Sequence, residues 1–430
     1  MTHQERLLKV IPGGAHTYSR GFDQFPTNAP QILERGKGTY VFDEKGNRFL
    51  DYGMALRAVN IGYAEDEIDA AAYEQIRKGN NLTRPSMIEL EAAELMVELI
   101  DSVDMVKFTK NGSTAVSAAV KLARAYTGRD LVARCADHAF FSYDDWFIGS
   151  TPLTKGIPQS TIDLTKMFKY NDIASLETLF EQYPGQFACV VMEAATTEDP
   201  SEGYLQKVQA LCRKNGAVFV VDEMISGFRW HMKGAQHLYG ITPDICTFGK
   251  AMANGFAVAA VAGRREIMEL GSIEFEGRER VFLLSTTHGA EMGGLGAFVA
   301  SMNFLQRHNV VEHLWDYGRK LMAMMQRQAE AHGIEKSFKV GGIPCSPYYL
   351  TMDNEDNHSF ALRTLFSQEM VRNGVLMPWI ALAYRHDDET LAATETALDR
   401  TFSVYRKALE EGVEKYLVGP AIKPVFRKFN

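Results

Sequence analysis

The sequence predicts an α/β protein with a mainly parallel, buried sheet. Short apolar runs rich in Val, Ile, Phe and Ala recur between longer segments of helical periodicity, which is the pattern of alternating strands and crossover helices. After about residue 300 the pattern changes to long helices around short strands, which indicates a separate α+β domain. A chain of 430 residues also exceeds what a single core usually holds, so we expect a large and a smaller domain.

Each expected element follows from a local pattern. The strand candidates are apolar runs, at 105–108, 131–133, 187–191 and 217–221. Helical periodicity covers 113–126, 173–182 and 204–215, and Asn215-Gly216 is a typical helix stop. Later helices are expected at 310–332, 359–373 and 389–411, with a strand at 346–352. The turn-rich start contains a hairpin strand near 36–43 with a turn at 44–47.

These patterns divide the chain into three parts. Residues 1–70 are expected to contribute to the small domain and the active site, 71–305 to form the large domain, and 306–430 the C-terminal small domain. The small domain would thus be built from both chain ends.

Composition excludes several classes of protein. The net charge is -8, with Lys and Arg scattered among Asp and Glu, so we expect no nucleic-acid partner. The five cysteines are odd in number and far apart, which suggests neither disulfides nor a metal site. The N-terminus does not resemble a signal peptide, and no apolar run approaches the ~18 residues of a membrane span. We therefore expect a cytoplasmic protein without membrane contact.

Two charged residues follow apolar runs where ligands of parallel sheets bind. Asp222 closes the run 217–221, and a buried carboxylate there is costly unless a positive group meets it; a helix cap or an internal salt bridge is the alternative. Lys250 lies among apolar and small residues, which favours a deprotonated, nucleophilic amine. Alone, it could equally be a lysine that extends to the surface.

The segment Lys110-Asn111-Gly112-Ser113-Thr114 joins a strand candidate to a helix. Gly allows backbone to approach an anion, and the helix start offers free N–H groups, so this is a candidate phosphate cradle, although ordinary helix capping explains it too. The three features together are what pyridoxal 5'-phosphate (PLP) requires: an acid for the pyridine nitrogen, a lysine for the aldehyde and a phosphate cradle.

With these motifs the sequence resembles fold-type I, class III aminotransferases, most closely glutamate-1-semialdehyde 2,1-aminomutase and its relatives. The resemblance is carried over nearly the whole chain by 11–14, 122–130, Asp222 to Arg229, 248–250 and 263–268. It implies PLP as cofactor, with Lys250 as the Schiff-base lysine and Asp222 as the pyridinium partner. Further cofactor contacts are implied at Gly112, Ser113, Phe140, Glu193, Met224 and Thr287.

The resemblance also implies partners. The segment around Thr287 corresponds to a loop that contacts the neighbour's phosphate, which implies a homodimer with shared active sites. Thr17 and Arg20 match positions that hold a substrate carboxylate in the aminomutase, although Arg20 could simply form a surface ion pair. A planar guanidinium suits a carboxylate well.

Two departures separate the chain from the aminomutase. The stretch after Phe147 is shorter than the aminomutase's mobile gate, and Thr114 stands where a Glu is usual. A shorter lid suits transfer between two substrates rather than retention of an intermediate. We therefore expect an aminotransferase that takes an amino group from an amino acid, glutamate being our choice, and gives it to an aldehyde or ketone.

The expected acceptor is a sugar acid such as 8-oxo-3-deoxy-manno-octulosonate in surface polysaccharide biosynthesis, because 12–26 and 80–86 look like aminomutase-like proteins of that role. An intramolecular aminomutase is the alternative. Intact Lys250 and Asp222 argue against a non-catalytic binding protein, and the absence of a Gly-x-Gly-x-x-Gly after any strand candidate argues against a nicotinamide dehydrogenase.

Overall fold

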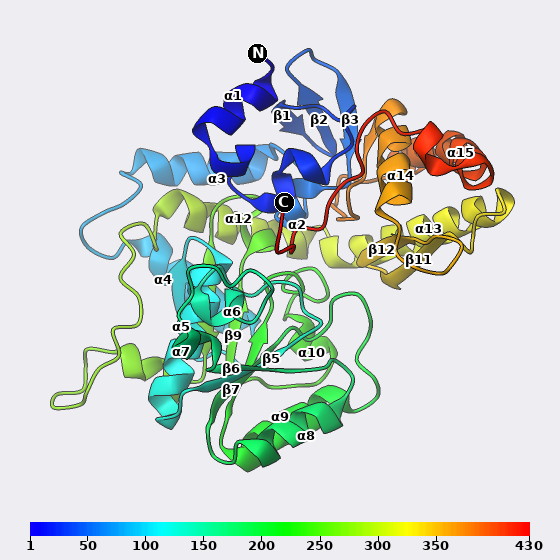
Figure 1. Cartoon of the computed structure of the whole chain (residues 1–430). Helices are drawn as coiled ribbons and strands as arrows, with labels where there is room; N and C mark the ends of the chain where they lie inside the picture. The colour runs from blue at the N-terminus through cyan, green and yellow to red at the C-terminus, as the bar shows by residue number, and fades with distance from the viewer. The chain divides into compact units, whose positions relative to one another are not determined.

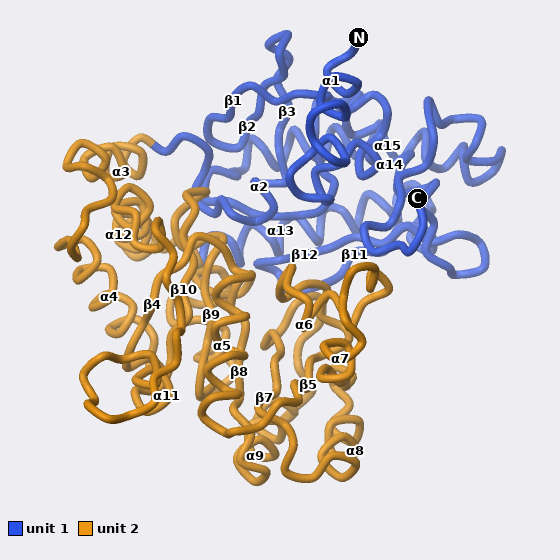
Figure 2. Tube along the Cα trace, turned by 60° about the vertical axis from the view of Figure 1, so that its left-hand side comes forward, with its two compact units in different colours: residues 1–65, 312–430 blue, residues 66–311 orange.

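The computed structural model describes residues 1–430 and divides into two compact units. Unit 1 comprises 1–65 and 312–430, and unit 2 comprises 66–311 (Figure 2). Unit 1 therefore combines both chain ends, whereas unit 2 is one continuous stretch. No helix combines the length and apolar character needed to span a membrane.

Unit 2 is built on a sheet of seven strands in the order β4-β10-β9-β8-β7-β5-β6. The strands are β4 (Met105–Thr109), β5 (Leu131–Cys135), β6 (Thr165–Phe168), β7 (Phe187–Met192), β8 (Val218–Asp222), β9 (Ile245–Phe248) and β10 (Ala259–Gly263). Neighbouring strands pair in parallel from β9 to β6, and β10 runs antiparallel to both β9 and β4. The mainly parallel sheet of a fold-type I enzyme is confirmed.

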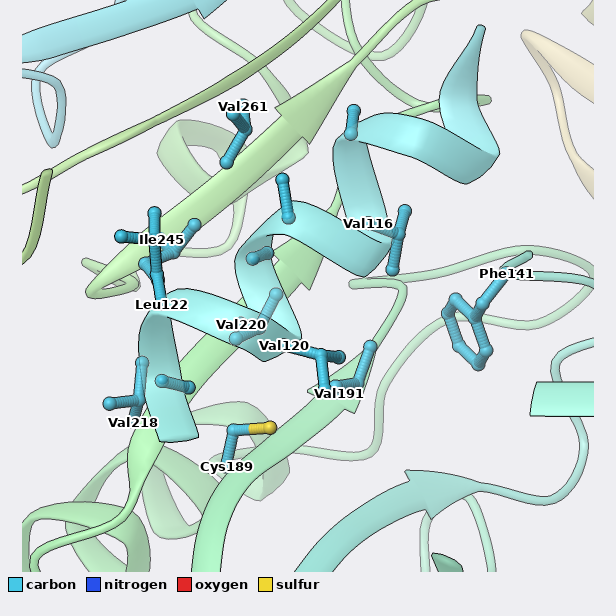
Figure 3. Close-up of a cluster of buried hydrophobic side chains, with 14 of the residues drawn as sticks. Val116, Val120, Leu122, Phe141, Cys189, Val191, Val218, Val220, Ile245 and Val261 are labelled. Atoms are coloured by element: carbon cyan, nitrogen blue, oxygen red, sulfur yellow. The ribbon is translucent and has the colours of Figure 1, made fainter. Parts of the chain in front are cut away.

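The helix α5 (Gly112–Thr127) buries its small and branched side chains against this sheet. Figure 3 shows Val120 of α5 beside Val191 of β7, and Leu122 of α5 beside Ile245 of β9. All are buried, and burying one such side chain contributes roughly 1.5–3 kcal/mol. This packing fixes the first turn of α5 relative to the strand ends.

The other helices of unit 2 are mostly crossovers between strands (Figure 1). They are α3 (Asp66–Arg77), α4 (Met87–Leu99), α6 (Asp145–Ile148), α7 (Gln159–Ile162), α8 (Ile173–Gln182), α9 (Tyr204–Asn215), α10 (Ala235–Leu238), α11 (Arg265–Met268) and α12 (Met292–Arg307). Gly216 follows α9 with φ of 63°, the left-handed conformation that ends a helix.

Unit 1 contains a four-stranded sheet in the order β1-β2-β3-β13 and a separate hairpin of β11 and β12. The strands are β1 (Leu33–Lys37), β2 (Tyr40–Asp43), β3 (Arg48–Asp51), β11 (Phe338–Ile343), β12 (Ser346–Thr351) and β13 (Val375–Leu376). The helices are α1 (His3–Val10), α2 (Met54–Arg57), α13 (Val310–Ala331), α14 (Phe360–Arg372) and α15 (Asp388–Glu411). Because β13 pairs with β3 in parallel, the two chain ends share one sheet.

The turn α2 of unit 1 is left-handed. Its four residues, none of them glycine, have φ between 38° and 67°, a conformation that costs roughly 1–2 kcal/mol per residue. Asp51 supports the turn by accepting the N–H groups of Gly53 and Met54 at 2.7 and 2.9 Å. Tyr63 donates its hydroxyl hydrogen to Asp51 and accepts the N–H of Ala55. Strained backbone held in this way is typical of ligand sites.

Candidate active site

Two neighbouring strands of unit 2 lead to Asp222 and Lys250, the two residues predicted to react. Asp222 is the last residue of β8 and pairs in register with Thr247 of β9, and Lys250 follows β9 after Gly249. Because β8 and β9 are parallel, the carboxylate and the amine emerge at the same edge of the sheet. The charge of Lys250 acts on the Asp222 carboxyl, so the structure brings these two predicted residues together.

The Asp222 carboxylate is held inside the protein. Its side chain is 1% exposed, and its Oδ1 accepts hydrogen bonds from the Met224 N–H at 3.0 Å and the Thr247 hydroxyl at 2.9 Å. Burial raises the pKa of this carboxyl above its usual value, although the charge of Lys250 and the two hydrogen bonds act to lower it. The carboxylate is thus oriented by its neighbours and favours a cationic partner.

Lys250 has an unusual backbone conformation. Its φ is 44°, in the left-handed region that non-glycine residues occupy only when their surroundings impose it. It opens the short 3-10 turn Lys250–Ala253, and the next three side chains are buried. The lysine is therefore fixed at its backbone while its side chain keeps partial access to solvent.

Met224 lies between two glycines from other elements. A Cβ at Gly112 would meet the Met224 Sδ at 2.6 Å, and a Cβ at Gly249 would meet the same sulfur at 2.6 Å. The thioether therefore contacts the start of α5 on one side and the end of β9 on the other. This contact joins Gly112, Met224 and the neighbour of Lys250 in one small region.

The N-terminus of α5 offers donors to an anion. The Asn111 side chain caps the helix by accepting the Thr114 N–H at 2.9 Å, and the N–H groups of Gly112 and Ser113 have no acceptor within the helix by its geometry. The hydroxyl of Ser113 accepts the Tyr143 N–H at 3.1 Å, so its hydrogen remains available for donation. These groups could hold a phosphate.

A network of hydrogen bonds ties the segment 142–146 to α5. The Ser117 hydroxyl donates to the Asp144 carboxylate and accepts the Trp146 indole N–H at 2.9 Å. Ser142 lies 3.0 Å from the same hydroxyl, oxygen to oxygen. We call Ser117, Ser142, Asp144 and Trp146 the α5 latch. Phe140 lies two residues before Ser142; it is 46% exposed and contacts the Phe147 ring edge-on at 5.6 Å.

Glu193 follows β7 and is buried with His138. The Glu193 N–H donates to the His138 Nδ1 at 3.0 Å, which places the hydrogen of the neutral ring on Nε2. Burial lowers the pKa of His138 from 6.5 to about 4. His138 is thus neutral at physiological pH, and its Nε2 has no hydrogen-bond partner.

Thr287 lies in an exposed segment of unit 2. Its carbonyl oxygen accepts a hydrogen bond from the Asn81 side chain at 2.9 Å, and its side chain is exposed. Nearby, Lys110 donates to the α12 cap Glu291 at 2.6 Å. Lys110 is therefore engaged by a carboxylate, and this ion pair connects the residue before the α5 cap with the cap of α12.

The two predicted carboxylate-binding residues belong to unit 1. Thr17 precedes the 3-10 turn Tyr18–Arg20. Arg20 is exposed, forms no ion pair, and lines a cavity within unit 1 that also includes Tyr63. Thr17 and Arg20 therefore belong to unit 1, whereas Lys250 belongs to unit 2.

Sequence reasoning missed three supporting features: the Thr247 hydroxyl on Asp222, the contact of Gly249 with Met224, and Ser117 of the α5 latch. Thr247 is an internal strand residue and Ser117 an ordinary helix residue, so neither carries a local signal. Gly249 was visible in the sequence, but only the structure shows which side chain requires its small size.

The donor set fits PLP. A buried carboxylate faces the region of Met224, an amine lies beside it, and the α5 N-terminus presents N–H groups to an anion. Asp222 could hold the pyridine nitrogen, Lys250 the aldehyde carbon, and Gly112 with Ser113 the phosphate. Bound there, PLP supplies an electron sink for a carbanion next to the amino nitrogen.

Comparison with known proteins agrees with this fit. The model of the family Aminotransferase class-III matches residues 23–377. A 3-aminobutyryl-CoA aminotransferase from Cloacimonas acidaminovorans is 32% identical over 94% of this chain and 97% of its own length. Glutamate-1-semialdehyde 2,1-aminomutase from Clostridium tetani is 28% identical over 85% and 90%.

Solved structures are similar over nearly the full length. The PLP form of the FumI protein from Sphingopyxis sp. MTA144 has a TM-score of 0.86 and 28% identity, covering 95% of this chain and 97% of that one. An omega-transaminase from Sphaerobacter thermophilus has a TM-score of 0.82 and 25% identity, covering 94% and 97%. Fold, family match and the geometry at Lys250 lead to one conclusion: the chain belongs to the class III aminotransferases, which are PLP-dependent enzymes.

Proposed function

We propose that this aminotransferase moves an amino group from glutamate to the aldehyde or ketone of a second substrate, with Lys250 and Asp222 at the reacting centre. The observation that carries the proposal is the convergence of the buried Asp222 carboxylate and the Lys250 amine at the ends of adjacent parallel strands. Transamination needs both groups: an anion to keep the pyridine nitrogen protonated and an amine to move a proton at the substrate carbon.

Each neighbouring residue has a defined part in this proposal. Lys250 Nζ takes the proton from the carbon that bears the amino group and returns a proton when the acceptor is aminated. Met224 would contact one face of the bound ring and Phe140 the other, with Glu193 as a further contact. The α5 N-terminus with Gly112 and Ser113 holds the phosphate, and its fixed donors cost no reorganisation during the reaction.

Thr287 extends the phosphate site across a homodimer in this proposal. The residue is exposed in the single chain. Its hydroxyl is therefore accessible to a second subunit. A second copy of the chain would place one Thr287 hydroxyl at each phosphate, and the active sites would then be shared.

We propose a sugar acid as the acceptor, such as 8-oxo-3-deoxy-manno-octulosonate in surface polysaccharide biosynthesis. Thr17 and Arg20 would hold its carboxylate, since Arg20 is exposed and forms no ion pair. Two relatives mark the alternatives. The name of the 3-aminobutyryl-CoA aminotransferase favours a β-amino thioester as donor, and that of the aminomutase favours an intramolecular transfer.

An absorbance experiment tests the proposed reaction. With PLP bound, the purified protein should show a visible band that disappears when glutamate is added, as the cofactor becomes aminated. Lys250→Ala should not form this band with PLP alone, because its amine is missing. A visible band that glutamate leaves unchanged would exclude glutamate as donor, and the thioester 3-aminobutyryl-CoA would then be added in its place.

The acceptor is tested by adding carbonyl compounds to the aminated protein. The sugar-acid aldehyde should restore the visible band, and a carboxylate-free sugar aldehyde should restore it much more slowly. The reverse order of rates would contradict the acid assignment. The aminomutase alternative predicts complete turnover of one substrate without any added donor, so an absolute requirement for glutamate excludes it.

A further inference from the structure

Unit 1 contains a cavity of about 770 Å³, a size within the range of roughly 300–1,000 Å³ found for small-molecule sites. We call it the unit 1 cavity. Its walls come from the N-terminal segment, the left-handed turn α2, the segment 378–379 and the C-terminal residues 420–423. Phe22, Leu56 and Ile422 give these walls an apolar character, so the body of a ligand would lie against hydrocarbon.

The charges at the cavity leave two cations without anionic partners. Arg20 and Lys423 form no ion pair, and Lys423 makes its hydrogen bonds through its backbone, donating to the Asp23 carbonyl at 2.9 Å and accepting from Gln24. In contrast, the Asp23 carboxylate is already bound by Arg427 at 2.6 Å. An acid entering the cavity would therefore meet two uncommitted cations.

The other charged groups do not reverse this balance. Asp51 is engaged by the hydroxyl of Tyr63 and by the N–H groups of the α2 turn, and burial raises the pKa of its carboxyl. Glu34 and Arg35 lie at the cavity with opposite charges, and Arg35 stacks on the Phe42 ring at 3.4 Å.

The C-terminal tail, residues 416–430, reaches the cavity because it is anchored at both ends. Gln368 accepts the Val418 N–H at 2.8 Å, and Thr364 accepts the Ile422 N–H at 2.9 Å; both side chains belong to α14 and are buried. Further on, Arg427 binds Asp23. Figure 1 shows the red tail returning beside the blue N-terminal segment. The tail lies beyond residues 23–377, which the family model matches.

We propose that the unit 1 cavity binds an organic acid with an apolar or uncharged body, and that the C-terminal tail determines which acids are accepted. This inference rests on the proposed function, because it assigns a recognition element to the substrate that Arg20 was proposed to hold. Arg20 and Lys423 hold the carboxylate from two sides, and Ile422 limits the width available to the body. Charge-assisted hydrogen bonds of this kind are among the strong ones.

Calorimetric titration of the holoenzyme with hexanoate tests the cavity, since this acid has no amino or carbonyl group and cannot react. Hexan-1-ol, which has the same chain without the charge, should bind more weakly. Lys423→Gln and Arg20→Gln should each weaken hexanoate binding by about three- to tenfold, because each removes one charge-assisted contact. Lys423→Arg should preserve binding. Equal binding to the wild type and both Gln variants, or no binding, would overturn the proposal.

The tail is tested separately with Thr364→Val, which preserves side-chain volume but removes the acceptor of the Ile422 N–H without altering the cavity lining. The variant should bind hexanoate more weakly with unchanged Arg20 and Lys423. Binding as strong as in the wild type would mean that the tail anchor does not shape the cavity. Far-UV circular dichroism establishes that each variant is folded.

Kinetics then distinguish the substrate from a separate effector as the natural acid. If the cavity binds the substrate, hexanoate should raise the apparent KM for glutamate without changing kcat. Lys423→Gln should reduce this inhibition. A change in kcat alone would assign the cavity to an effector and overturn its substrate role. The glutamate-dependent loss of the visible band is recorded in the same samples. Its absence would contradict the proposed function, whereas its presence without hexanoate binding would contradict only the cavity.

Discussion

At the residue scale, the candidate site depends on positions where the side chain is small or the backbone is unusual. Gly112 and Gly249 both leave space for the sulfur of Met224, and Lys250 has a left-handed φ. The sequence singles out Asp222 because it closes an apolar run, and Lys250 because it lies among apolar and small residues. The use of Gly249 could not be predicted, because it depends on a side chain 25 positions earlier in the sequence that only the fold brings close.

Gly249→Ala should displace Met224 and weaken PLP binding. A Cβ at 2.6 Å from the sulfur forces the thioether to move, and overpacking of this kind costs roughly 1–3 kcal/mol, or about five- to a hundredfold in affinity. Equilibrium titration of the apoprotein with PLP measures the effect. In a Met224→Ala background the same substitution should be nearly neutral, because the clashing atom is gone; an undiminished effect there would show that the contact is not the cause.

At the scale of elements, helical periodicity and helix-boundary residues predicted the bounds of two crossover helices correctly. The bounds of α8 and α9 agree at both ends with the predicted 173–182 and 204–215. The strands β6 and β10 were not predicted, and β10 is a short run of mostly Ala whose single branched side chain is Val261. The turn α2 could not be predicted either, since its four residues include no Gly or Asn and its shape depends on Asp51 and Tyr63.

The α5 latch gives an element-scale prediction. Ser117→Ala removes the shared partner of Asp144 and Trp146, and leaving buried polar groups unpaired costs roughly 1–3 kcal/mol. The segment that follows Phe140 should loosen, so PLP should dissociate faster, as measured by transfer to an excess of an acceptor apoenzyme. Ser403→Ala is the matched control, because that exposed helix serine bonds only to the Asp399 carbonyl. Equal dissociation rates in both variants would contradict a positioning role for the latch.

At the scale of the whole molecule, buried histidines link stability to pH. In the folded protein the pKa of His138 is lowered from 6.5 to about 4 because the ring is buried, so between these values the unfolded chain binds a proton that the folded chain does not. The contribution of His138 to the free energy of unfolding is therefore complete above about pH 6.5 and is lost as the pH falls toward 4. The expected domain bounds stay a prediction, and the burial of His138 could not be predicted because it depends on packing between segments far apart in the sequence.

His138→Asn should flatten this pH dependence. The Asn side-chain oxygen can accept the Glu193 N–H in place of the imidazole nitrogen, but it cannot take up a proton. Urea midpoints measured from pH 7 to pH 4 should fall less steeply for the variant than for the wild type. His332→Asn serves as the control, because that ring pairs with the exposed Asp399. Parallel curves for the wild type and His138→Asn would rule out His138 as a source of acid sensitivity.

The pairing of β13 with β3 has a consequence for synthesis. Unit 2 is one uninterrupted stretch, 66–311, and can begin to fold while the ribosome is still translating the remainder. The sheet of unit 1 cannot be completed at that stage. The strand Arg48–Asp51 has no partner for its parallel edge until Val375 and Leu376 have been synthesised, more than three hundred residues later. Until then the N-terminal strands expose an unpaired edge, which makes the nascent N-terminal segment the part of this chain most dependent on chaperones.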